Sequence, residues 1–249
     1  MAIKQAQTGA TFTVAEVREY NERGFVVVKR LFDPEQTVPM ADAVEGILAE
    51  LREDARKGDK TALRTMENGV YVGLTLRRRY LRDVFRNPNI VGRLNAIFGP
   101  KVGFLSDKIV FKSEDVSFPT PWHQDYAYWG GSHKMSVWMS LDVADTGNGC
   151  MQFLPGSHLK DIEHDHLENP ERGGFRHQIL GLERLGYGEK DIVTVEAQPG
   201  DAVFFHDDLL HRSLPNTSGA RRRAFIITYR SLSEPDKDYP NLAAAEPIT

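Results

Sequence analysis

The sequence has little cysteine and no long hydrophobic run. Cys150 is its single cysteine, which excludes an internal disulfide and favours a reducing compartment. No apolar run reaches the roughly 18 residues of a membrane span, and residues 1–10 lack the apolar segment of a secretory signal. The formal net charge of -4 gives no basic footprint for nucleic acid and no polybasic patch for membranes. These absences predict a cytoplasmic protein that binds neither nucleic acid nor membrane.

The 249 residues, 41% hydrophobic and 27% charged, predict one domain spanning residues 1–249. Its N-terminal part, about residues 13–98, is predicted to be largely helical. Thr13 opens a first helix that Gly24 ends, Asp33-Pro34 opens a second, and Asn87-Pro88 opens a third. The β-branched run 25–28, between the first two helices, predicts a buried strand.

The jelly-roll core is predicted at about residues 100–230, where short apolar runs alternate with turn signals. The expected strands are 102–105, 108–112, 122–125, 135–143, 150–154, 192–196, 202–205 and 224–230. We therefore expect a mainly β fold with flanking α: a double-stranded β-helix (jelly roll, cupin-like) whose N-terminal helices buttress one sheet.

Two stretches depart from this rhythm. The polar stretch at about 160–190 is too long for a plain turn, and we expect a lid insertion over a site. The tail 231–249, which contains three prolines, is expected to be either mobile or an interface arm.

The chemistry is concentrated in two short segments. His123 and Asp125 are two residues apart, so on an extended strand both side chains would leave the same face and could bind one ion. His211 lies far along the chain, so only the fold can add it to the pair. Two imidazoles and one carboxylate form the arrangement expected of a non-heme Fe(II) oxygenase. The His-x-Asp pair alone is a weak signal, and its neighbours strengthen it.

Several further segments occur in a specific order around these residues. They are Tyr20 with 24–28, then 122–126, 138–142, 148–158, 199–201, 211–213 and Arg222. In this order they resemble the phytanoyl-CoA dioxygenase family of Fe(II)/2-oxoglutarate-dependent oxygenases, over about residues 13–230. The resemblance implies cofactors Fe(II), 2-oxoglutarate and O2. It also implies hydroxylation of an unactivated C–H bond of a small organic substrate, with release of succinate and CO2. It does not identify that substrate, and the oligomeric state is not readable.

The resemblance also assigns roles. His123, Asp125 and His211 match the catalytic iron ligands of the family. Arg222 matches the arginine that holds the far carboxylate of 2-oxoglutarate, and Ser213 matches a hydroxyl beside it. Trp138 matches a tryptophan that lines the cosubstrate pocket.

Residue chemistry agrees with an arginine in this role, because a buried carboxylate needs a cation and the guanidinium fork suits it. Strand alternation sends Arg222 to the opposite face from Arg221 and Arg223, without indicating which face is inside. The choice of Arg222 therefore rests on family spacing. Lys108 could face either the pocket or solvent, and we take it as a further candidate for the cofactor pocket.

Other interpretations of the same residues stay open. His206 is the main rival to His211 as a ligand, although an edge histidine with a structural hydrogen bond is its simpler interpretation. His164 and His166 could form a second metal pair, but their acidic surroundings favour a solvated loop. For the whole chain, a non-oxidative metal-binding cupin-type isomerase or binding module is the alternative, and an interaction protein that keeps the fold is another.

Overall fold

The computed structural model describes residues 10–168, 175–233 and 246–249. Helix α1 (Val14–Arg23) begins with the predicted capping box, in which the Thr13 hydroxyl accepts from the Glu16 amide and the Glu16 carboxylate accepts from the Thr13 amide. It ends at Gly24, whose φ of +84° suits glycine. A Cβ there would also lie 2.6 Å from Nδ1 of His158.

The second and third predicted helices are confirmed as α2 (Pro34–Arg56) and α5 (Pro88–Phe98). The sequence did not reveal α3 (Lys60–Asn68), η1 (Leu74–Leu76) or α4 (Arg79–Val84), which are short. In the described part of the chain, no helix combines the length and apolarity needed to cross a lipid bilayer.

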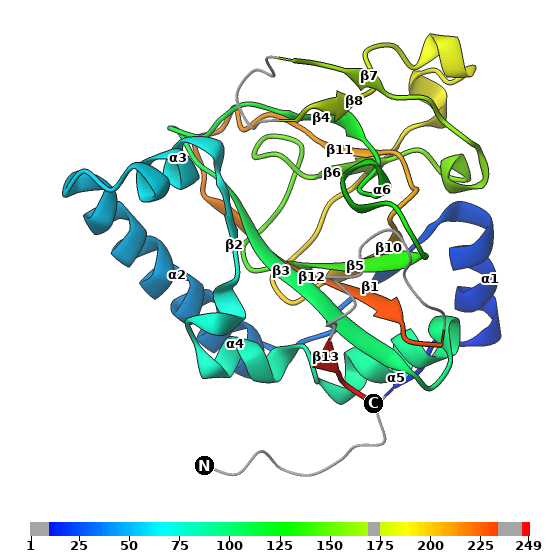
Figure 1. Ribbon diagram of the computed structural model, residues 1–249, viewed down its shortest axis with the longest axis horizontal. Coiled ribbons are helices and arrows are strands. Elements are labelled where there is room, and N and C mark those ends of the chain that lie inside the picture. The colour runs from blue at the N-terminus through cyan, green and yellow to red at the C-terminus, as the bar shows by residue number, and fades with distance from the viewer. Residues whose placement is uncertain (1–9, 169–174, 234–245) are drawn as a thin grey trace.

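Two antiparallel sheets form the jelly roll, and a third sheet has only two strands. The larger has the order β1-β10-β5-β12-β3-β13, with β2 also paired to β3. Its strands are β1 (Phe25–Val28), β2 (Val70–Val72), β3 (Val102–Lys112), β5 (Lys134–Ser140), β10 (Ala202–His206), β12 (Arg222–Ser231) and β13 (Glu246–Pro247). The smaller has the order β4-β11-β6-β9, with β4 (Thr120–His123), β6 (Met151–Phe153), β9 (Val193–Val195) and β11 (His211–Ser213). Figure 1 shows α2, α3 and α4 on one side of the large sheet and the small sheet on the other. The predicted jelly roll with buttressing helices is therefore confirmed.

The large sheet is buried on both faces. On its outer face, Val44 and Ile47 of α2, both 0% exposed, belong to a core with Val137 of β5. On its inner face, Trp138 packs in a second core with Phe153 and Phe205 between the sheets. Adjacent residues of β5 thus serve opposite cores, as strand alternation requires.

Several strand boundaries differ from the prediction. Segments 102–105 and 108–112 form one strand, β3. The polar residues between them, Ser106 and Asp107, pair with Thr228 and Ile227 of β12, and the bulge at Leu105 does not end the pairing. Strand β5 ends at Ser140 rather than Val143, and β4 ends at His123 rather than Asp125. Strand β11 was not predicted, since its three residues are all polar and carry no alternation signal.

The predicted lid region contains a small hairpin of β7 (Asp165–His166) and β8 (His177–Gln178), followed by η3 (Glu183–Leu185) and η4 (Glu189–Asp191). Ile162 and Ile179 anchor it in a satellite core with Trp122 and Leu210. Residues 169–174 of this stretch lie outside the described residues. Of the predicted tail, the end forms β13 against β3, and 234–245 also lie outside them.

Candidate metal and cosubstrate site

His123, Asp125 and His211 are buried together between the two sheets. Pairing of β4 with β11 sets His211 opposite His123, and their ring centroids are 4.2 Å apart. One potential ligand atom of each of the three residues lies within 4.8 Å of the others. The fold therefore brings together the three side chains that the sequence proposed as one metal site.

Asp125 reaches this site by a different route from the one predicted. Strand alternation was expected to align it with His123, but β4 ends at His123, and Asp125 has helical dihedrals of φ -61° and ψ -32°. It directly precedes the short helix α6 (Tyr126–Trp129). The turn folds the carboxylate back, so that Oδ1 lies 3.8 Å from Nε2 of His123. The expected strand geometry was wrong, although the two side chains meet.

Each histidine is oriented by a carbonyl two residues before it. Nδ1 of His123 bonds the Pro121 carbonyl and Nδ1 of His211 bonds the Leu209 carbonyl, both at 2.9 Å. A carbonyl oxygen only accepts, so Nδ1 carries the proton in each ring and Nε2 keeps a free lone pair. Burial lowers the pKa of His211 and, with the charge of His211, lowers the pKa of His123 to about 3. Both rings are therefore neutral near pH 7, the form that binds metals.

Asp125 is held as a carboxylate. Burial acts to raise its pKa, but Lys108, His211 and His123 outweigh that effect and hold the pKa at about 2. Nζ of Lys108 lies 3.6 Å from Oδ1, and the Ser136 hydroxyl donates to Oδ2 at 3.3 Å. Two neutral imidazoles and one carboxylate are thus the donor set offered.

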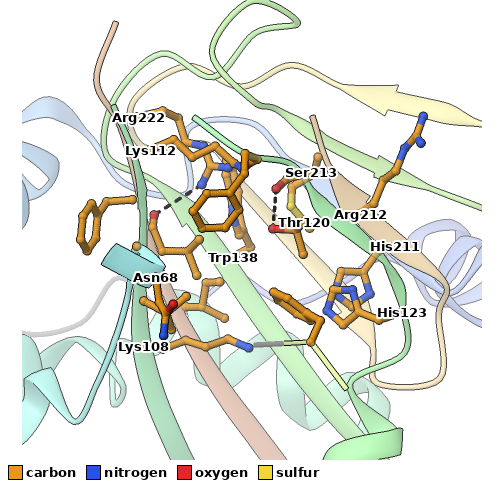
Figure 2. Close-up of a pocket in the computed structure, with 18 of the residues that line it drawn as sticks. Asn68, Lys108, Lys112, Thr120, His123, Trp138, His211, Arg212, Ser213 and Arg222 are labelled. Atoms are coloured by element: carbon orange, nitrogen blue, oxygen red, sulfur yellow. Dashed lines mark hydrogen bonds between the residues drawn. The ribbon is translucent and has the colours of Figure 1, made fainter. Parts of the chain in front are cut away.

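A cavity extends from this donor set to Arg222 at its far end (Figure 2). Arg222 is 0% exposed. Its Nη2 donates to the Gly149 carbonyl at 2.6 Å and its Nη1 to the Val110 carbonyl at 3.4 Å, while its Nε has no acceptor among the described residues. Burial lowers its pKa to about 10, so it stays charged at neutral pH. Among the described residues, no carboxylate is bonded to this buried cation.

The neighbouring arginines face the other way. Arg223 pairs with Asp142 at 2.9 Å and with Glu45 of α2 at 3.1 Å, and Arg221 approaches the same two carboxylates. Arg222 alone of this run lines the cavity. The choice made on family spacing agrees with this parity.

The remaining predicted pocket residues also line the cavity. Trp138 is 1% exposed, with Cζ of Arg222 6.0 Å from its ring centroid. The Ser213 hydroxyl donates to the Thr120 hydroxyl at 2.9 Å. Lys108, which sequence could not orient, faces the cavity at the metal end.

Sequence reasoning missed Lys112 and Thr120. Lys112 pairs with Arg222 across β3 and β12, and its ammonium donates to the Phe118 carbonyl. Burial and the charge of Arg222 lower its pKa to about 7. A signal existed, because Lys108 and Lys112 are four apart on one strand and share a face.

The rival histidines lie elsewhere. His206 ends β10, where its Nδ1 accepts from the Asp208 amide at 3.0 Å. It forms a second possible ligand group with His133 and Asp207, but the two imidazoles stack at 3.8 Å and 9°. Lone pairs in parallel stacked rings do not converge on one ion, so this group is a poor metal site. His166 lies in the β7–β8 hairpin, where Asp165 pairs with Arg184.

A jelly roll with two histidines and one carboxylate at a cavity that ends in a buried arginine defines a class of metal-dependent oxygenases. The model of the phytanoyl-CoA dioxygenase (PhyH) family matches residues 20–224. The chain belongs to this family, and the predicted class of Fe(II)/2-oxoglutarate-dependent dioxygenase is confirmed.

Similar proteins agree with this membership. The chain is 30% identical to a Stutzerimonas stutzeri protein named "probable alpha-ketoglutarate-dependent hypophosphite dioxygenase", over 85% of this chain and 76% of that protein. It is 29% identical to the 1-deoxypentalenic acid 11-beta-hydroxylase of Streptomyces arenae, over 81% and 74%. The fold is shared with the alpha-ketoglutarate-dependent carbocyclase SnoK of nogalamycin biosynthesis, with a TM-score of 0.69, 22% identity, and coverage of 96% and 94%.

Proposed function

We propose that this protein hydroxylates an unactivated C–H bond of a small organic substrate, using Fe(II), 2-oxoglutarate and O2 and releasing succinate and CO2. One observation carries the proposal: a single cavity joins a neutral-imidazole and carboxylate donor set to a buried, unmatched guanidinium. A metal alone would use the first feature, and only a cosubstrate with a distant anionic group uses both.

In this proposal His123 and His211 bind iron through Nε2, and Asp125 binds it through its carboxylate. The carbonyls of Pro121 and Leu209 fix both tautomers before the metal arrives, so no ring has to reorient. The bound iron and 2-oxoglutarate supply the oxidising chemistry, and the protein supplies positioning and exclusion of water.

Arg222 would hold the far carboxylate of 2-oxoglutarate. A charge buried in a cavity needs a partner of opposite sign, and no carboxylate in the described part of the chain is bonded to the buried guanidinium of Arg222. The Ser213 hydroxyl and the Trp138 ring border the same space. We add Lys112, whose charged form the incoming dianion would stabilise.

Two further assignments are part of this proposal. The stretch 160–190 would act as a lid, since the ring of Phe175 lies 4.8 Å from that of His123 and the Tyr128 hydroxyl donates to the His177 carbonyl at 3.2 Å. A cytoplasmic location is supported by the single cysteine, Cys150.

The first test is an anaerobic titration of the Fe(II)-loaded protein with 2-oxoglutarate, followed by its metal-to-ligand absorption band. A band that saturates supports the proposal, and a cupin-type isomerase or binding module would give none. A succinate-release screen over acids, amino acids and acyl thioesters, with mass spectrometry of any product, then identifies the substrate class. Succinate without an oxygenated product in any arm would contradict the hydroxylase assignment.

A further inference from the structure

The cavity wall is strongly basic although the chain carries a net charge of -4. Of the described residues that line it, Asp125 is the sole carboxylate, whereas Lys108, Lys112 and Arg222 are cationic. Arg212 also borders the cavity, but its guanidinium lies over the ring of Trp122, and Figure 2 shows it pointing away. Arg222 and Lys112 occupy one end, and Lys108 lies toward the other (Figure 2).

Half-buried Lys108 differs from buried Lys112 in how its ammonium is held. Nζ of Lys112 donates to a carbonyl oxygen, whereas Nζ of Lys108 donates no hydrogen bond to a described residue. Its contacts are the Asp125 carboxylate at 3.6 Å and the ring of Trp129, with Nζ 5.8 Å from the centroid. Its side chain is 25% exposed, so it stands where the cavity meets solvent.

Charge balance shows what this lysine lacks. With iron bound, the Asp125 carboxylate would be a metal ligand and would no longer neutralise Lys108. Iron(II), Asp125, the 2-oxoglutarate dianion, Arg222 and Lys108 together leave one positive charge in excess, and charged Lys112 adds a second. An ammonium with free donors in a partly desolvated site is stabilised by an anion that enters with the substrate.

Resting on the proposed function, we propose that the substrate is a small organic anion, a carboxylate or an oxyanion of similar size, and that Lys108 binds its charged group. Apolar side chains, among them Val70, Val110 and Phe175, also line the cavity. They would receive the hydrocarbon part of the molecule, so the charge lies against Lys108 while the carbon to be oxidised faces the metal ligands.

The same ammonium could instead bind the metal-proximal carboxylate of 2-oxoglutarate, and the experiment separates these two anions. The Fe(II)–2-oxoglutarate holoenzyme is titrated anaerobically with butanoate and with butanamide, which match in shape and differ in charge. We expect butanoate to shift the metal-to-ligand absorption band at a concentration at least about tenfold lower than the butanamide concentration that gives the same shift. This factor is the effect of one charge-assisted hydrogen bond. Lys108→Met should abolish this preference, and Lys108→Arg should retain it.

Lys101→Met is the matched control, since Lys101 is exposed and precedes the first residue of β3. It should behave as wild type. If Lys108→Met weakens 2-oxoglutarate itself tenfold and leaves the butanoate preference intact, the lysine serves the cosubstrate and the inference is overturned. It is also overturned if the two probes act alike in wild type, or if neither moves the band. If the wild-type protein forms no absorption band with 2-oxoglutarate, the result contradicts the proposed function rather than this inference.

Discussion

The guanidinium groups of Arg222 and Arg223 lie on opposite faces of β12. The first enters the cavity between the sheets and the second pairs with Asp142 and Glu45 on the helical side. Two consecutive residues thus have different roles: the guanidinium of Arg222 is available to a ligand, and that of Arg223 connects α2 to the sheet. Truncating the side chain of Arg222 should therefore weaken ligand binding, whereas truncating that of Arg223 should lower the stability of the fold.

Arg222→Ala should raise the 2-oxoglutarate requirement several hundred-fold while leaving iron affinity nearly unchanged. A buried charge stripped of its partner costs roughly 3–5 kcal/mol, which corresponds to that factor. Titration of the absorption band measures it. Arg223→Ala is the matched variant and should lower the melting temperature with little change in 2-oxoglutarate affinity. The reverse pattern would place the cosubstrate carboxylate elsewhere.

His211→Ala should abolish iron binding and turnover, because two of the three donors cannot hold the metal with useful affinity. His206→Ala should leave iron bound, since the His206 ring stacks on His133 away from the cavity. Iron content after loading and desalting of both variants provides the measurement. Iron retained by His211→Ala and lost from His206→Ala would mean that the rival group binds the metal.

Lys112 should make 2-oxoglutarate binding depend on pH. Its pKa of about 7 means that it is charged below that pH and neutral above it, and the cosubstrate dianion favours the charged form. Binding above pH 7 therefore requires uptake of a proton, and affinity should fall as pH rises from 7 to 8.5, by at most about tenfold per unit. Lys112→Met should flatten the profile. A wild-type affinity that does not change over this range would contradict the assignment.

Lys112 should also make the stability of the ligand-free protein depend on pH. A lysine whose folded-state pKa is lowered binds fewer protons than in the unfolded chain between about 7 and its ordinary value of 10.5. The contribution of Lys112 to the free energy of unfolding must then rise with pH across that window. Below pH 7 this pH-dependent gain is absent. Thermal melts of the metal-free protein at pH 7, 8 and 9, compared with Lys112→Met, isolate this contribution.

Ile47→Ala should destabilise the fold by about 2–5 kcal/mol, the usual cost of emptying a fully buried aliphatic site. Ile47 is 0% exposed in the core between α2 and the large sheet. Val38→Ala on the same helix is the control, because Val38 is 56% exposed and should change stability by less than about 0.5 kcal/mol. Denaturant unfolding of both variants gives the comparison.

The local signals of the sequence were enough for the ends of α1, the starts of α2 and α5, and most strands. Thr13 with Glu16, and Gly24, specify a cap and a stop through their own side chains or the lack of one. The local signals were insufficient where contacts with residues distant in sequence determine the backbone conformation. The bulge in β3 follows from its pairing with β12, and the turn at Asp125 brings the carboxylate to His123 in a way that periodicity cannot express.

The site was predictable in its residue types and less so in its orientation. Family spacing selected Arg222, but only the packing of Arg223 against Asp142 and Glu45 shows which face of β12 is inside. Lys112 was overlooked because a lysine at the end of a strand is ordinarily solvated. The spacing of Lys108 and Lys112 places both on one face of β3, but only the packing around that face shows that Lys112 is buried.

The two carbonyl-bound imidazoles have a consequence for which metal the protein carries. Under the proposed ligand assignment, His123 and His211 present lone pairs at neutral pH and give up no proton to an incoming ion. For two nitrogens and one oxygen, the general order of affinity places nickel, copper and zinc above iron(II). Affinity alone therefore does not select iron(II), and metal supply contributes to which ion is bound. Protein purified over a nickel resin should arrive carrying the wrong ion, inactive until it is stripped and reloaded with iron.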